Sequence, residues 1–277
     1  AKSDKNIVSF IFLLRQKRFM WRLKMDSGNI GFVLLCAAFV FVMTPGLAMF
    51  YGGLVRKKNV VNTMMTSIFI IGIGIVMWVL FGYSLSFAPS GNAFIGDFRW
   101  LGLEGVSLTE GYTDDASIPN MVFSAFQMMF AVITPALITG AVAGRMKFKS
   151  IFVFTIFWSL IVYYPLAHMV WGQGGLLGAD GIGALDFAGG DVVHISSGVS
   201  ALVLCILLGK RHDYEHSIYR IHNIPTVVLG ASLLMFGWFG FNAGSALAAD
   251  GLAAHAFMTT GVSAAAAMLS WMLCDVI

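Results

Sequence analysis

Charge is strongly segregated along this chain, and the segregation limits the folds open to it. Each uncharged stretch has about the roughly 17–25 residues that a helix needs to cross a bilayer. Only 11% of the residues are charged and 58% are hydrophobic, against roughly 25% and 45–50% in a soluble domain. The sequence therefore predicts an all-α polytopic membrane protein. Seven segments contain no Asp, Glu, Lys or Arg and are the predicted spans: 29–51, 64–87, 120–143, 150–170, 192–209, 224–245 and 256–274.

Residues 1–28 form a basic tail that we do not expect to belong to the fold, so the predicted domain covers 29–277. Residues 1–24 hold seven Lys or Arg and one apolar run, from Ile7 to Leu14, which is too short to span a membrane. The run also lacks the small-residue cleavage site of a signal peptide. Because the chain starts with Ala1 and Met25 directly precedes the first span, we interpret 1–24 as upstream or fused sequence.

The basic residues predict the orientation of the spans. The loops after the first, third and fifth spans hold nine Lys or Arg, whereas the loops after the second, fourth and sixth hold one. The positive-inside rule places the basic loops in the cytoplasm. The acidic loop 88–119 and the glycine-rich loop 171–191 then face outside. The tail 1–24 would also lie outside despite its charge, which is a second reason to separate it from the domain.

Titratable residues at the ends of the fourth and fifth spans are the first candidates for function, because such groups are costly in a membrane. His194 lies two residues inside the fifth span and indicates either a buried histidine satisfied by a neighbour or a pore-lining imidazole. His168, at the outer end of the fourth span, is more typical of an interfacial histidine. Asp186 can cap the N-terminus of the fifth helix or, less favoured, bind a cation directly. Asp191 competes for the same capping role.

Four aromatic residues lie near the outer halves of the spans: Phe130, Trp171, Trp238 and Phe241. They are equally typical of the interfacial aromatic belt, which needs no ligand, and of a cage whose ring faces bind a small cation. The spacing does not choose between these interpretations.

The remaining chemistry points away from an enzyme. Cys36, Cys205 and Cys274 all lie in spans, and their spacing fits neither a metal motif nor a disulfide framework. We find no nucleophile–base pair and no set of metal ligands. We therefore expect no metal, no cofactor and no nucleic-acid partner.

Four motifs in the chain occur together in a recognisable order. The motifs are TPGLAMFYGGLVRKKN at 44–59, AHMVWG at 167–172, DFAGGDVVHISSGVSALVLCILLGKR at 186–211 and GWFGFNAGSA at 237–246. They resemble the signature of the ammonium transporter family, the Amt/Mep/Rh superfamily, and their order and spacing also match, from residue 29 to the end. The presence of Trp171 makes the chain similar to the Amt/Mep branch rather than to the Rhesus proteins.

The resemblance implies a role for each matched residue. Trp171, Phe130 and Ser245 match an outer site that recruits ammonium, and Asp186 matches the acid that supports it. Phe130 and Phe241 match a stacked pair that closes the outer mouth, and His194 matches the first of two facing pore histidines. The implied function is ammonium or ammonia transport at the cell membrane for nitrogen uptake, by recruitment, deprotonation and passage through a narrow apolar pore. The alternatives are an ammonium sensor with a signalling domain on the same fold and an unrelated facilitator for a neutral solute.

The resemblance also implies an architecture larger than this chain. Family members have about eleven spans in two inverted five-helix repeats and form homotrimers, and a cytoplasmic PII-type regulatory protein is an implied partner. The seven spans here would supply the first repeat and two helices of the second. We expect a C-terminally truncated domain that lacks the second pore histidine and does not conduct alone. Whether ammonia, ammonium or separated ammonia and a proton crosses stays open.

Overall fold

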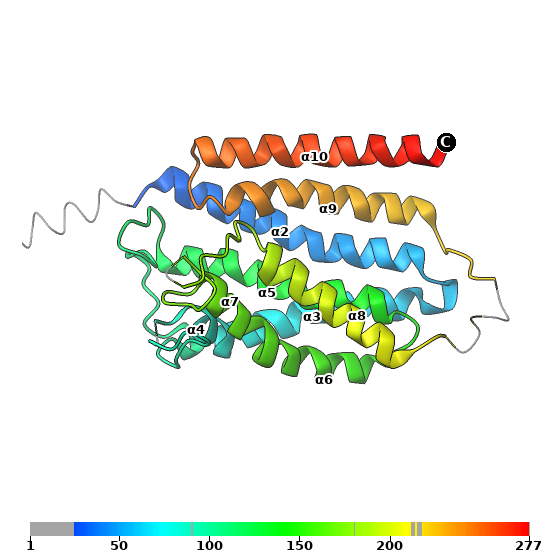
Figure 1. Ribbon diagram of the computed structural model, residues 1–277, viewed down its shortest axis with the longest axis horizontal. Coiled ribbons are helices and arrows are strands. Elements are labelled where there is room, and N and C mark those ends of the chain that lie inside the picture. The colour runs from blue at the N-terminus through cyan, green and yellow to red at the C-terminus, as the bar shows by residue number, and fades with distance from the viewer. Residues whose placement is uncertain (1–24, 90, 180, 212–213, 215–217, 277) are drawn as a thin grey trace, which may run out of the picture.

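A computed structural model describes residues 25–277 except 90, 180, 212–213, 215–217 and 277. The predicted all-helical membrane architecture is confirmed: seven helices are long and apolar enough to cross a membrane, and they run side by side in one bundle (Figure 1). The seven spans are α2 (Ser27–Leu54); η1 (Lys57–Asn59), α3 (Val60–Met77), η2 (Trp78–Gly82) and α4 (Tyr83–Phe87) together; α5 (Asn120–Val142); α6 (Phe148–Trp158), η4 (Ser159–Tyr163) and α7 (Tyr164–Trp171) together; η5 (Gly190–Ile195) with α8 (Ser196–Leu208); α9 (Ile224–Gly244); and α10 (Gly251–Val276).

The first helix begins earlier than the predicted domain boundary at residue 29. The Asp26 side chain accepts a hydrogen bond from the Asn29 backbone N–H at 2.8 Å, and the Asp26 backbone N–H donates to the Ser117 carbonyl at 2.9 Å. A capping acid satisfies N–H groups that would otherwise be unpaired, so residues 26–28 belong to the fold. The part of the predicted tail from 1 to 24 lies outside the described residues.

The second span also starts earlier, at Lys57 instead of 64. Residues Lys57–Asn59 form the 3₁₀ turn η1, which leads directly into α3. Charged side chains at a helix end reach the polar membrane surface while the helix continues inward. The predicted span 64–87 therefore covers only the hydrocarbon part of this helix.

Helix α5 is the centre of the bundle, because 67% of the residues in its most apolar 18-residue stretch are buried. Helices α2 and α9 cross with their backbones close together, and glycine makes the approach feasible. A Cβ at Gly230 would lie 2.6 Å from the carbonyl oxygen of Gly46, and one at Gly240 would lie 2.7 Å from the Phe39 Cβ. A larger side chain at either position would push the two helices apart.

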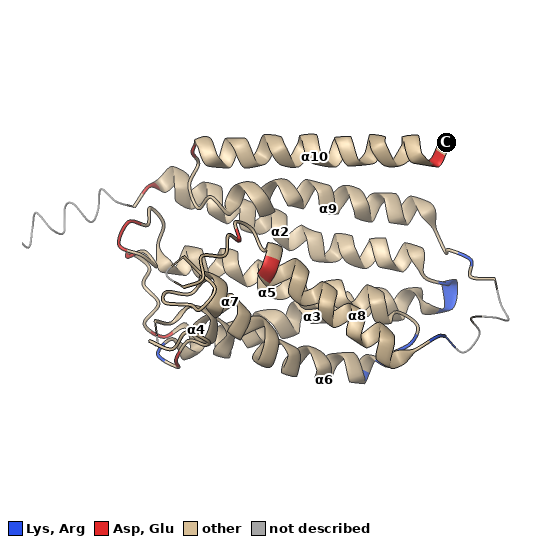
Figure 2. Cartoon of the chain, in the orientation of Figure 1, with Lys and Arg blue, Asp and Glu red and all other residues tan. Residues whose placement is uncertain are grey.

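The spans that contain α8, α9 and α10 are the most exposed of the bundle. In the most apolar stretch of the α8 span and in that of α9, only 22% of the residues are buried. For α10, which lies at the edge of the bundle in Figure 1, the buried share is 6%. A largely apolar helix surface of this kind suits lipid or further protein. Figure 2 shows Lys and Arg gathered mainly at one end of the bundle and most Asp and Glu at the other, as the predicted topology requires.

Candidate functional site

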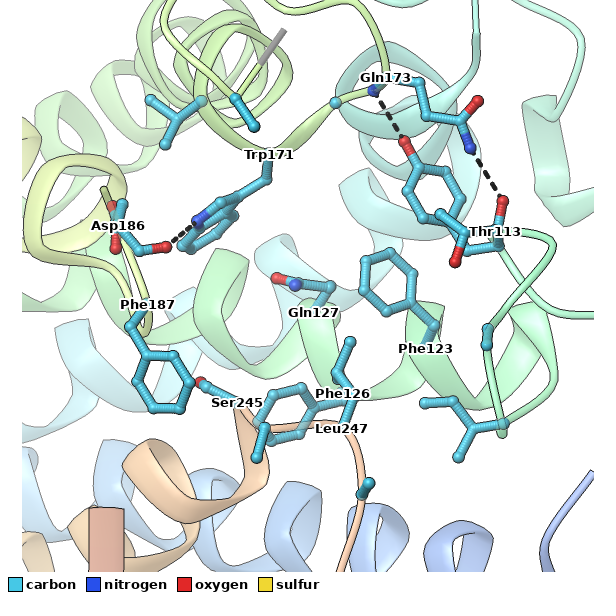
Figure 3. Close-up of a pocket in the computed structure, with 18 of the residues that line it drawn as sticks. Thr113, Phe123, Phe126, Gln127, Trp171, Gln173, Asp186, Phe187, Ser245 and Leu247 are labelled. Carbon is cyan, nitrogen blue, oxygen red and sulfur yellow. Dashed lines mark hydrogen bonds between the residues drawn. The ribbon is translucent and has the colours of Figure 1, made fainter. Parts of the chain in front are cut away.

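A cavity of about 860 Å³ opens at the acidic end of the bundle, and we call it the outer vestibule. Its wall combines α5, the end of α7, the loop that follows α7 and the connection between α9 and α10. Figure 3 shows side chains from these segments converging on one space. Three residues assigned to the outer site by sequence resemblance (Phe130, Trp171 and Ser245) and the supporting Asp186 all line it.

Asp186 holds the start of the fifth span in place. One carboxylate oxygen accepts from the backbone N–H groups of Gly189 and Gly190 at 2.5 and 2.8 Å, and the other accepts from Asp191 and Val192 at 2.8 and 3.0 Å. These N–H groups belong to the helix start, where no intrahelical carbonyl is available. The capping role expected of Asp186 is thus present, and Asp191 is one of the residues being capped.

The turn into this helix requires glycine. Gly189 has a φ of +108°, in the left-handed region. A Cβ at this position would also lie 2.6 Å from the Cγ2 of Val193. Glycine avoids both problems, since it has no Cβ. Gly189 of the DFAGGD motif therefore lets the chain fold back under the Asp186 carboxylate.

Trp171 presents its ring, and not its N–H group, to the vestibule. The indole Nε1–H donates to the backbone carbonyl of Asp186 at 3.0 Å, as Figure 3 shows. The ring meets Phe130 edge-on, with the centroids 6.1 Å apart and the planes at 83°. Because the only donor of the indole is already used, the π face is what Trp171 has left to offer a ligand.

Below the vestibule, aromatic rings form a continuous file toward the membrane interior. The ring centroids of Phe130 and Phe241 are 4.4 Å apart, and both side chains are buried. His194 follows, with its ring centroid 6.0 Å from that of Phe241. Trp238 stacks on His194 at 5.7 Å with the planes 11° apart. The belt interpretation therefore does not describe Trp238, because the ring packs on a neighbouring side chain inside the file.

His194 lies on η5, a π-helical segment that leads into α8. Segments of this kind widen the helix locally and occur often at functional sites. The imidazole is exposed and lies beside Trp238 of α9. Of the two interpretations of His194, a buried histidine satisfied by a neighbour does not hold within the described part of the chain, and the pore-lining imidazole stays a prediction.

Ser245 is set up as a hydrogen-bond acceptor. Its hydroxyl donates to the Phe241 carbonyl at 2.8 Å, and a serine hydroxyl has only one proton to give. The lone pairs of the oxygen remain. A vestibule ligand that approaches Ser245 is therefore favoured when it donates a hydrogen bond.

His168 is not interfacial, contrary to the expectation from its position. It is fully buried, and its ring nitrogens lie 3.1 Å from the Ser86 carbonyl oxygen and 2.8 Å from that of Asn92. The outer loop folds over the end of α7 and covers the ring. His168 thereby ties this loop to the bundle and takes no part in the vestibule wall.

Tyr112 and Gln173 join two outer loops at the rim of the vestibule. The Gln173 backbone N–H donates to the Tyr112 hydroxyl at 3.0 Å, and its side-chain amide donates to the Tyr112 carbonyl at 2.9 Å. Burial raises the pKa of Tyr112 to about 12, so the hydroxyl stays neutral at physiological pH. The link therefore holds the rim without adding charge.

One vestibule residue was missed from the sequence. Gln127 lies on α5 and lines the cavity beside Phe126 and Phe130. Its side-chain oxygen is buried and has no hydrogen-bond partner in the described structure. An amide side chain seven residues inside an uncharged span was the available signal, but it did not indicate which way the side chain faces.

Comparison with known proteins gives a consistent result. The chain is 52% identical over 251 residues to an ammonium transporter of Bacillus subtilis (strain 168), covering 91% of this chain and 60% of that protein. The crystal structure of Candida albicans Mep2 is similar with a TM-score of 0.84 and 33% identity, over 92% of this chain and 56% of that one. A structure titled "Sensor Amt Protein" has a TM-score of 0.78 and 29% identity, over 89% and 61%.

The chain thus spans somewhat less than two thirds of these relatives. The model of the Ammonium Transporter Family matches residues 31–277, which include every vestibule residue named above. The long apolar helices and these relatives together identify a multi-pass membrane protein. The chain belongs to the Ammonium Transporter Family.

Proposed function

We propose that the complete protein, the product of the reading frame that contains this chain, carries ammonium or ammonia across the cell membrane. One observation carries the proposal: the vestibule leads from a tryptophan face and an acceptor hydroxyl, through a closed phenylalanine pair, to a histidine. The Bacillus subtilis relative described above, which is named as an ammonium transporter, supports the same function.

Recruitment follows from the chemistry of the vestibule wall. The Trp171 and Phe130 rings offer negative π faces that attract a small cation, and Ser245 offers lone pairs. Ammonium has four N–H donors and satisfies both requirements. Potassium carries the same charge but donates no hydrogen bond, so the hydroxyl favours ammonium over potassium. Asp186 serves indirectly, because its carboxylate is already occupied by backbone N–H groups.

Passage requires a change in the substrate. The buried Phe130–Phe241 pair leaves an apolar route, and a bare ion in such a route is very costly. Transfer of a proton from ammonium to water in the open vestibule, which leaves ammonia and a hydronium ion outside the gate, removes the charge. The neutral ammonia then meets His194, whose ring nitrogens exchange hydrogen bonds along the pore. We therefore propose Phe130 and Phe241 as the gate and His194 as a pore residue.

The test is current on a solid-supported membrane after ammonium pulses, with the complete protein in liposomes. We expect a saturable current with ammonium and a much smaller one with equal potassium. Protein-free liposomes and a Trp171→Leu variant are the controls. A current that is absent, or equal for the two cations, contradicts the proposal. Methylammonium uptake that ammonium does not inhibit favours the neutral-solute facilitator.

An ammonium sensor is a second candidate, and one observation favours it: the structural likeness to a protein titled as a sensor. The vestibule chemistry serves binding in both cases. The two functions differ in the domain expected after the last span, since a histidine-kinase or cyclase domain in the reading frame favours sensing. Current from the complete protein favours transport.

The assembly is proposed on family resemblance. We propose a homotrimer with a pore in each subunit, and a PII-type protein as a regulator on the basic, cytoplasmic side. The open apolar faces of α8 to α10 supply surface for lipid or protein contacts. The mass of the complete protein in detergent tests the trimer, and co-purification with a PII protein tests the partner.

A further inference from the structure

We infer that Gln127 is a second hydrogen-bond acceptor of the recruitment site, presented to the ammonium ion by rotation of its side-chain amide. The inference rests on the proposed function and adds a specificity residue to it. Figure 3 shows the Gln127 side chain in the vestibule, between Trp171 and Ser245 in this view.

The helical position of Gln127 places it at the level where the cation is recruited. Residues three and four apart share one face of a helix, so Phe123, Gln127 and Phe130 on α5 point the same way, and all three line the vestibule. Gln127 is one turn above Phe130, the outer ring of the proposed gate. Gln127 is therefore a polar side chain among the phenylalanines that α5 contributes to the vestibule wall.

The amide oxygen of Gln127 has no hydrogen bond in the described structure, although only 9% of the residue is exposed. The oxygen Oε1 is buried without a partner, while the nitrogen Nε2 is not among the buried unpaired atoms. A buried acceptor that lacks a partner is unfavourable, and native structures keep few of them. A structural role would require that the amide bind a neighbour. A ligand-binding role requires the opposite, a polar group left free until the ligand arrives.

A half-turn about the Cγ–Cδ bond exchanges the amide oxygen and nitrogen. The turn breaks no hydrogen bond of the oxygen, because Oε1 makes none in the described structure. It brings the oxygen to the vestibule surface, in the same cavity as the acceptor hydroxyl of Ser245. An ammonium ion then donates to both oxygens while the Trp171 ring covers a further side. Methylammonium has one donor fewer and gains less from a second acceptor.

The test uses Gln127→Leu in the complete protein, with ammonium-evoked current measured against concentration. Leucine removes the acceptor and also removes the unpaired buried oxygen. We expect the half-saturating ammonium concentration to rise about tenfold or more, the factor for one hydrogen bond to a charged group. The midpoint of thermal unfolding should stay equal or rise. The preference for ammonium over methylammonium should shrink.

Two further variants make the result specific. Gln173→Leu is the matched control, since Gln173 lies at the rim with its amide already donated to Tyr112. We expect it to lower the unfolding midpoint and to change the half-saturating concentration less than twofold. Gln127→Met retains the length of the side chain without the amide oxygen and should behave as Gln127→Leu does, which separates the lost acceptor from a change of shape.

Two outcomes overturn the inference. A half-saturating concentration within twofold of wild type in both Gln127 variants shows that the amide does not bind the ion. Equal losses of stability and of affinity in Gln127→Leu show a structural role. Absence of current from the wild-type protein is a different failure, because it refutes the proposed transport function as well.

Discussion

Replacing Asp186 by Asn tests whether hydrogen bonds, and not charge alone, hold the vestibule together. The two carboxylate oxygens of Asp186 accept four backbone N–H groups, two on each oxygen. In the variant one oxygen becomes an NH₂ group, which donates, so two of these N–H groups face a donor. Hydrogen bonds to charged groups contribute about 1.5–3 kcal/mol each, but averages in membrane proteins are nearer ~0.6 kcal/mol.

We take about 1 kcal/mol for each of the two lost bonds, because Asp186 is only half-buried. Loss of the negative charge at a helix N-terminus adds about 0.3–1 kcal/mol. Asp186→Asn should therefore destabilise the complete protein by about 2–3 kcal/mol. The hydrogen bonds make the larger contribution.

Asp191→Asn is the matched control. It removes the same charge from the same helix start, yet the Asp191 carboxylate is not part of the cap. We expect it to cost no more than ~1 kcal/mol, the charge effect alone. The assay is thermal or denaturant unfolding of both purified variants in one detergent. Equal destabilisation by the two substitutions would refute the hydrogen-bond argument and leave charge as the cause.

Four further predictions concern the site and the fold. Trp171→Leu should weaken ammonium recruitment about threefold to thirtyfold, the range for a cation–π contact of roughly 0.5–2 kcal/mol, and should narrow the ammonium-to-potassium current ratio; an unchanged ratio leaves the ring without a binding role. His194→Asp should admit potassium, because a fixed negative charge in the pore favours a dehydrated cation; potassium current measured beside wild type decides this. Gly240→Val should lower the unfolding midpoint by forcing α2 and α9 apart, since even a Cβ there would lie 2.7 Å from Phe39, whereas Gly72→Val, with open space around it, should not. A cysteine at position 147 should resist impermeant thiol reagents added outside intact cells, and labelling from outside would refute the predicted topology.

The architecture could be predicted from the sequence alone. Long uncharged segments have one stable solution in a bilayer, because every backbone polar group must be satisfied within the membrane and helices satisfy their own. The seven spans found in the structure were therefore predictable. The helix ends were harder to predict: Ser27 and Lys57 start helices ahead of the predicted spans 29–51 and 64–87, since polar residues continue a helix where it leaves the hydrocarbon.

The roles of individual polar side chains depended on tertiary structure. The position of His168 suggested an interface, but a loop that is distant in sequence covers the ring completely. The role of Gln127 could not be predicted, because the sequence does not indicate that its side-chain oxygen lacks a hydrogen-bond partner. The sequence position of Trp238 was equally compatible with the interfacial aromatic belt and with a cation cage. Only the packing of α9 shows that its ring stacks on His194.

The physical reason is the range of the interactions involved. Burial in a bilayer acts on each segment separately, so composition along the chain is enough to predict it. A hydrogen-bond partner or a ring contact comes from another helix, and its position depends on how the helices pack. Asp186 lies between these cases. Its capping hydrogen bonds are local, so the position of Asp186 just before the fifth span was enough to predict them. The hydrogen bond from the Trp171 indole to the Asp186 carbonyl, in contrast, depends on how the outer loop folds over α7.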